Sequence, residues 1–188
     1  ILAVLSWLGV RNTPEDAGFP SIREMEGQAR HASREQHWWH DLLGVLATRR
    51  VWPGFWVNLG MPASLLAFLG LWAIPFLRDL HGLERSAASL YTTVALASFA
   101  GSTLFCGWFS DRMNRRKPLL VIGTLLYGMA WLGIVHASWQ PGVLGMAWFV
   151  LMGFGCGSFA LTYAGAKEVV IPALSGMAIA LVNTGVFL

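Results

Sequence analysis

The chain has 188 residues, of which 55% are hydrophobic and 12% are charged, whereas about a quarter of the residues of a soluble domain are charged. This composition excludes an ordinary soluble domain, and the ten Trp and eleven Phe residues are typical of proteins at membrane interfaces. The formal net charge of +3 would indicate a nucleic-acid partner only if the basic residues gathered on one surface. Cys106 and Cys156 both lie in apolar runs, so we expect buried, inert thiols rather than metal ligands.

Residues 1–50 precede the most apolar part of the chain. Residues 1–10 are apolar but too few to cross a bilayer, so we interpret them as the end of a spanning helix and the chain as an internal fragment of a longer membrane protein. Residues 11–50 are polar and mixed in charge, which predicts a solvated loop. Within it, apolar residues recur at helical spacing from Trp38 to Leu46 and predict an amphipathic helix. That helix would lie either in the membrane interface or on the ends of the helix bundle.

Four apolar runs follow this loop, and each is long enough to cross a bilayer as a helix. They are residues 52–77, 86–109, 118–136 and 142–166, and a fifth run begins near Pro172. The first contains Pro53, Pro62 and Pro75, and proline within a spanning helix often marks a bend. Because the connecting turns are short, successive helices should be antiparallel neighbours. The predicted fold class is all-α, a polytopic transmembrane helical bundle.

The basic residues are distributed unevenly between the two ends of these predicted helices. Of the 13 Lys and Arg residues, all but Arg78 and Arg85 fall in 11–50, in 110–117 or just after the fourth run. The positive-inside rule therefore predicts that the loops 11–50, 110–117 and 165–172 of an integral membrane protein are cytoplasmic. Because the cations are spread over three loops, they predict topology in a lipid bilayer and no nucleic-acid partner.

The turn between the second and third runs carries a motif. It reads Gly107-Trp-Phe-Ser-Asp111-Arg112-Met-Asn114-Arg115-Arg116-Lys117, and it resembles the cytoplasmic signature loop of the major facilitator superfamily. That loop, Gly-x-x-x-Asp-Arg/Lys-x-Gly-Arg/Lys-Arg/Lys, joins the second and third helices of the family and recurs between the eighth and ninth. Asn114 replaces the second Gly of the pattern, and Asn is the residue that next best tolerates positive φ.

The long charged loop one helix pair upstream indicates that this turn is the second-half copy of the motif. The resemblance then implies that residues 1–10 end helix six and that 11–50 form the cytoplasmic central loop. Residues 51–188 would form the C-terminal bundle, with helices seven to ten and the start of eleven. This is about half of a twelve-helix fold, and the N-terminal half of the same protein would be its partner. The implied function is secondary transport of a small solute by alternating access, without a cofactor.

The resemblance also implies site residues. The turn would latch and release the cytoplasmic face through Gly107, Asp111, Arg112, Asn114, Arg115 and Arg116, although its cations could instead serve only to set orientation. In this interpretation Gly107 admits a neighbouring helix, and Asp111 accepts hydrogen bonds from Arg115 or from a helix N-terminus. The candidates for substrate binding are the polar residues Asn58, Tyr91, Tyr163 and Asn183. Each of these could instead form a hydrogen bond between helices.

Several other features of the sequence argue against particular kinds of site or activity. No acid or base lies within the four runs except His136, so any coupling residues lie elsewhere or transport is coupled otherwise. Residues 153–157 alternate Gly with other residues inside an apolar run, which predicts close helix packing rather than a nucleotide-binding loop. His31, His37 and His40 lack a further ligand, so no metal site is predicted. A membrane enzyme is disfavoured because the runs contain no nucleophile–base pair, and a sensor or receptor that keeps the fold without transporting is the remaining alternative.

Overall fold

The computed structural model describes residues 18, 38–136 and 139–188. Our predictions for residues 1–10, for most of the 11–50 loop, and for His31 and His37 lie outside this range. Within it the chain forms helices and no strand, which confirms the all-α prediction. Four helices are long and apolar enough to cross a membrane: Trp52–His81, Arg85–Met113, Lys117–His136 and Val143–Glu168. These four correspond to the four predicted runs.

The first spanning helix is continuous despite its three prolines. It consists of α4 (Trp52–Asn58), α5 (Ser64–Ala67) and α6 (Ala73–His81), joined by π-helical turns at Leu59–Ala63 and Phe68–Trp72. Pro53 lies in the first turn, where a missing N–H costs nothing. Pro62 lies inside the first π-helical turn, where the altered hydrogen-bond ladder accommodates its missing N–H. The helix continues past the predicted end at residue 77 to His81 and stops at Gly82, whose φ is 65°.

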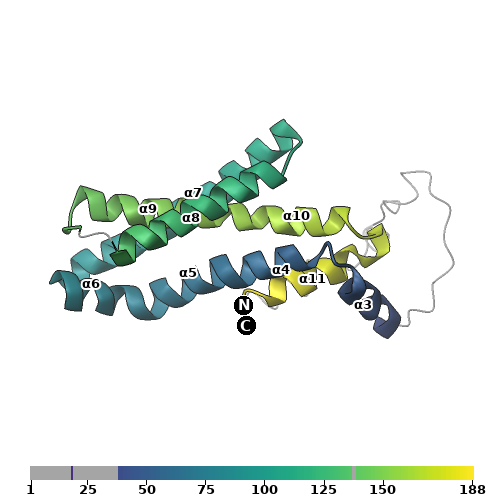
Figure 1. Ribbon diagram of the computed structural model, residues 1–188, viewed down its shortest axis with the longest axis horizontal. Coiled ribbons are helices and arrows are strands. Elements are labelled where there is room, and N and C mark those ends of the chain that lie inside the picture. The colour runs from purple at the N-terminus through teal and green to yellow at the C-terminus, as the bar shows by residue number, and fades with distance from the viewer. Residues whose placement is uncertain (1–17, 19–37, 137–138) are drawn as a thin grey trace. The chain divides into compact units, whose positions relative to one another are not determined.

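The remaining helices complete the bundle. They are α7 (Arg85–Met113), α8 (Lys117–His136), α9 (Val143–Cys156), α10 (Leu161–Glu168) and α11 (Ser175–Thr184). A 3-10 turn, Gly157–Ala160, joins α9 to α10 without a break, and a second one, Pro172–Leu174, precedes α11. Figure 1 shows the rod of α9 and α10 running alongside the rod of α4, α5 and α6, with α7 and α8 crossing obliquely.

Glycines in α9 bring two neighbouring helices into direct backbone contact, as predicted for residues 153–157. A Cβ on Gly153 would collide with the carbonyl oxygen of Ala95 in α7. A Cβ on Gly155 would lie 2.6 Å from the backbone nitrogen of Tyr127 in α8. Small residues allow this close approach of helix backbones within a membrane, where van der Waals packing is a main source of helix association.

The predicted burial of the free thiols Cys106 and Cys156 is also confirmed.

The short helix α3 (Trp38–Ala47) packs on the ends of the later helices. Val45 is fully buried in an apolar cluster that also contains Val51, Ala166, Ala178 and Val182. The indole Nε1 of Trp52 donates a 2.9 Å hydrogen bond to the carbonyl oxygen of Leu46, which fixes the end of α3 to the start of α4. The helix thus packs on the bundle through Val45, while Leu43 on the same helix is 59% exposed; its placement in the membrane interface stays a prediction.

Candidate functional site

The turn between α7 and α8 has the backbone conformation that its motif requires. α7 ends at Met113, and Asn114 follows with φ of 50°, the left-handed conformation expected for this position. Among the described residues it is the one residue other than glycine with positive φ. The guanidinium of Arg112 lies 5.9 Å from the ring centroid of Trp108, one helical turn earlier, in a cation–π contact. We call the end of the bundle that carries this turn the turn end.

Two of the predicted contacts of the turn are not made within the described part of the chain. A Cβ placed on Gly107 would meet no neighbouring atom within 4 Å, so no helix in this part approaches it closely. Asp111 is exposed and has no ion pair or hydrogen bond to a described residue, so the bond predicted from Arg115 is absent. The preceding residue, Ser110, is buried with a hydroxyl that has no partner among the described residues.

One ion pair does connect the turn to a distant helix end. A guanidinium nitrogen of Arg116 lies 3.1 Å from Oε1 of Glu168, the last residue of α10. Arg116 is among the predicted site residues, but its partner Glu168 was missed. The available signal was modest: Lys167 and Glu168 follow the fourth apolar run on the same predicted side as the turn. Both side chains remain partly exposed, at 31% and 61%, so this pair can form and separate at small cost.

Beside this ion pair, the turn end contains a pocket of about 470 Å³. The start of the first spanning helix, the turn itself, the first turn of α8 and the end of α10 supply its described lining. The charged groups of that lining are Arg50, Arg116, Lys117 and Glu168. Its other walls are mostly apolar and include Val51, Pro53, Leu120, Leu161 and Val169.

The predicted substrate residue Asn58 lies between helices rather than on a cavity wall. Its side chain is fully buried, and Nδ2 donates hydrogen bonds to the carbonyl oxygen of Gly54 at 2.9 Å and to Oγ1 of Thr162 at 2.7 Å. The amide oxygen Oδ1 is buried without a partner among the described residues. In this conformation Asn58 therefore joins α4 to α10, which was the alternative that the sequence left open for it.

Two other predicted substrate residues contact one another. The hydroxyl of Tyr163 in α10 donates a 2.8 Å hydrogen bond to Oδ1 of Asn183 in α11. Asn183 is exposed and Tyr163 is half-buried, so this polar pair is open to a ligand. The pair was not predicted as such, because the relative rotation of two helices cannot be obtained from spacing within each of them.

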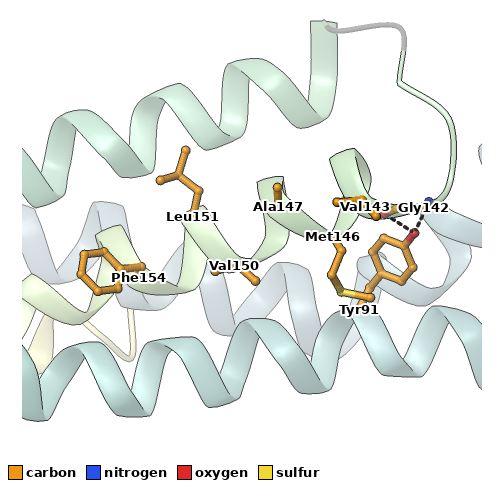
Figure 2. Close-up of a pocket in the computed structure, with 8 residues that line it drawn as sticks. All are labelled: Tyr91, Gly142, Val143, Met146, Ala147, Val150, Leu151 and Phe154. Atoms are coloured by element: carbon orange, nitrogen blue, oxygen red, sulfur yellow. Dashed lines mark hydrogen bonds between the residues drawn. The ribbon is translucent and has the colours of Figure 1, made fainter.

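The fourth candidate, Tyr91, lies in an apolar groove at the opposite end of the bundle. Its hydroxyl accepts a 2.8 Å hydrogen bond from the backbone nitrogen of Gly142 and donates a 3.3 Å bond to the carbonyl oxygen of that residue. Figure 2 shows this contact at one end of a groove of about 750 Å³ that continues along α9 to Phe154. The other described lining residues are Val143, Met146, Ala147, Val150 and Leu151. Tyr91 thus fixes the start of α9 and offers little spare hydrogen-bonding capacity.

Comparisons with known proteins place the chain in a family. Neither the comparison with curated proteins nor the comparison with solved structures gives a match. A family model described as the Major Facilitator Superfamily matches residues 60–188, which is more than half of the chain and contains the turn, the Arg116–Glu168 pair and most of the spanning helices. With its all-helical bundle of candidate membrane spans, this protein belongs to the Major Facilitator Superfamily of membrane transporters.

Proposed function

We propose that this protein is a secondary transporter that carries a small solute across the membrane by alternating access. Family membership supports transport in general. The observation that supports alternating access is the partly exposed Arg116–Glu168 ion pair. It joins the α7–α8 turn to the end of α10, and its exposure allows it to break when the helix ends separate. Asp111, exposed in the last turn of α7, is free to pair with a group that approaches in another conformation.

We further propose the membrane arrangement that the charges predict. The turn end faces the cytoplasm of a bacterial cell, and residues 51–188 form the C-terminal bundle, preceded by the cytoplasmic loop 11–50 and the end of a sixth helix. Large apolar side chains remain exposed on the described helices, including Leu71, Leu104 and Val143. Lipid and the helices of an N-terminal half of the same protein would cover such residues.

The Tyr163–Asn183 pair is the best candidate for contact with the transported solute. It offers a hydroxyl and an amide side by side on α10 and α11, and it is accessible in this conformation. Tyr91 and Asn58 stay candidates for conformations in which their present hydrogen bonds are broken. Because the four apolar runs contain no Asp or Glu, the solute would be recognised here through neutral hydrogen bonds.

Flux measurements test the transporter against the alternative, a sensor that binds without transporting. The purified full-length protein is screened against a panel of small solutes by thermal stabilisation, and each stabilising solute is then measured for uptake into proteoliposomes. A transporter gives saturable uptake above protein-free vesicles, whereas stabilisation without uptake supports the sensor.

A variant tests the proposed substrate contact. Asn183→Ala should raise the KM for uptake about tenfold through loss of a hydrogen bond, and the adjacent change Thr184→Ala is the matched control.

A further inference from the structure

The pocket at the turn end has an excess of positive charge. Its described lining contains Arg50, Arg116 and Lys117 but only one carboxylate, that of Glu168. These three cations come from two distant parts of the chain, since Arg50 precedes the first spanning helix, whereas Arg116 and Lys117 are neighbours at the start of α8. Like charges gathered in one concavity repel one another unless an anion lies between them.

Arg116 is the most enclosed of these cations and keeps unused donors. Its side chain is 31% exposed, and one guanidinium nitrogen contacts Glu168. A guanidinium has five N–H donors in a planar fork that matches the geometry of a phosphate group. Arg50 and Lys117 form no ion pair with any described residue. The pocket can therefore hold an anion against three cationic groups while Glu168 competes for only one of them.

The rest of the pocket requires a ligand that is also apolar. Most of the exposed surface of its lining is carbon, from side chains such as Pro53, Leu120 and Leu161. A free phosphate ion would satisfy the cations and leave these walls in contact with water. The pocket also adjoins the ends of candidate spanning helices, because its lining residues Lys117 and Glu168 are helix termini and Val51 and Asn114 directly adjoin two others. In a bilayer, such helix ends would lie near the lipid headgroups.

We propose that this pocket binds the phosphate headgroup of an anionic membrane lipid, with Arg50, Arg116 and Lys117 contacting the phosphate and the apolar walls contacting the glycerol and upper acyl chain. Basic pockets between spanning helices are a known physical solution for holding such headgroups. Glu168 then acts as a competitor, since its carboxylate occupies Arg116 when no lipid is present. The pocket shares the Arg116–Glu168 pair with the proposed transport cycle, but lipid retention and solute uptake are measured independently, so either proposal can fail without the other.

Native mass spectrometry and lipid exchange into nanodiscs test the proposal on the full-length protein. We expect phosphatidylglycerol to be retained in preference to phosphatidylcholine. Arg116→Gln should weaken retention about tenfold, because a charge-assisted contact is lost. Glu168→Gln should instead strengthen it several-fold, because the competing carboxylate is gone. These opposite signs distinguish a lipid site from an ion pair that only stabilises the fold, whose loss would have the same effect in both variants.

A matched control variant, and a comparison of lipid with inorganic phosphate, determine whether the effect is specific to this pocket and to a lipid. Arg78→Gln removes the same charge at the opposite end of the bundle and should leave retention of phosphatidylglycerol unchanged. Equal retention in Arg116→Gln and Arg78→Gln, or a loss in Glu168→Gln as large as that in Arg116→Gln, would overturn the proposal. Stabilisation of the protein in phosphatidylcholine nanodiscs by millimolar inorganic phosphate, equal to that from phosphatidylglycerol, would assign the pocket to a free anion and overturn the lipid as its ligand.

Discussion

The side-chain amide of Asn58 in α4 donates a 2.7 Å hydrogen bond to the hydroxyl of Thr162 in α10. This bond joins two helices that lie more than 100 residues apart in the sequence. Thr162 in turn donates to the carbonyl oxygen of Phe159, in the 3-10 turn that precedes α10. The contact therefore connects the start of the first spanning helix to the segment just after the 3-10 turn Gly157–Ala160. A polar contact of this kind fixes the relative rotation of two apolar helices, which apolar packing alone specifies less well.

A double-mutant cycle measures the strength of this contact. Asn58→Ala, Thr162→Val and the double variant are compared by reversible unfolding in mixed micelles. We expect an interaction energy of about 0.6 kcal/mol, and at most about 1.7 kcal/mol, as is typical of hydrogen bonds between spanning helices. Additive effects of the two changes would contradict the contact. If Asn58→Ala has normal stability but a raised KM for uptake, Asn58 binds the substrate rather than joining the two helices.

The packing of α8 against α9 gives a second prediction, with a control on the same helix. A Cβ on Gly123 would collide with the side chain of Ser158 and lie 2.9 Å from the carbonyl oxygen of Gly155, whereas a Cβ on Gly128 would meet nothing within 4 Å. Gly123→Ala should therefore destabilise the bundle by about 1–3 kcal/mol through overpacking. Gly128→Ala should be neutral or slightly stabilising, because Ala has the higher helix propensity. Equal effects on thermal unfolding would show that α8 does not pack on α9 through Gly123.

The spans and the turn could be predicted from the sequence because their signals are local. Hydropathy over about 20 residues identifies a spanning helix, and the charged residues from Asp111 to Lys117 mark the turn between two of them. The partners of those residues could not be predicted in the same way. Whether Arg116 meets Glu168 depends on the rotation and register of α10, to which hydropathy is insensitive.

The same limit applies to α3 and to the substrate candidates. The spacing of apolar residues predicted a helix with one apolar face, but that face suits a membrane interface and a protein surface equally. Burial of Val45 against α10 and α11 is a property of the assembled bundle. Likewise, Asn58 and Asn183 are polar residues in apolar runs, yet the structure buries the first between helices and exposes the second. Only tertiary packing distinguishes them.

A third prediction concerns Asp111, which should matter for transport but not for the stability of the described bundle. Asp111 is exposed and unpaired among the described residues, so Asp111→Asn removes no contact seen there. If the latch forms in another conformation of the transport cycle, this variant should reach the membrane at the normal level and lose about tenfold in uptake rate. Asp79→Asn, an exposed change at the opposite end of the bundle, is the matched control. Normal uptake by Asp111→Asn would contradict the latch.

The backbone of the turn gives the last prediction. Asn114 has φ of 50°, a conformation that costs a residue with an ordinary Cβ about 1–2 kcal/mol and costs glycine nothing. Asn114→Gly, which restores the family's residue, should therefore keep or slightly raise the unfolding temperature of the full-length protein. Asn114→Ala should lower its stability by about 1 kcal/mol, because Ala lacks the short polar side chain that makes the left-handed conformation tolerable for Asn. The neighbouring exposed change Met113→Ala controls for loss of side-chain area at the same helix end. If Asn114→Ala and Asn114→Gly unfold at the same temperature, the turn does not require positive φ at this residue, and the tight connection between α7 and α8 must be maintained by contacts of Arg116 instead.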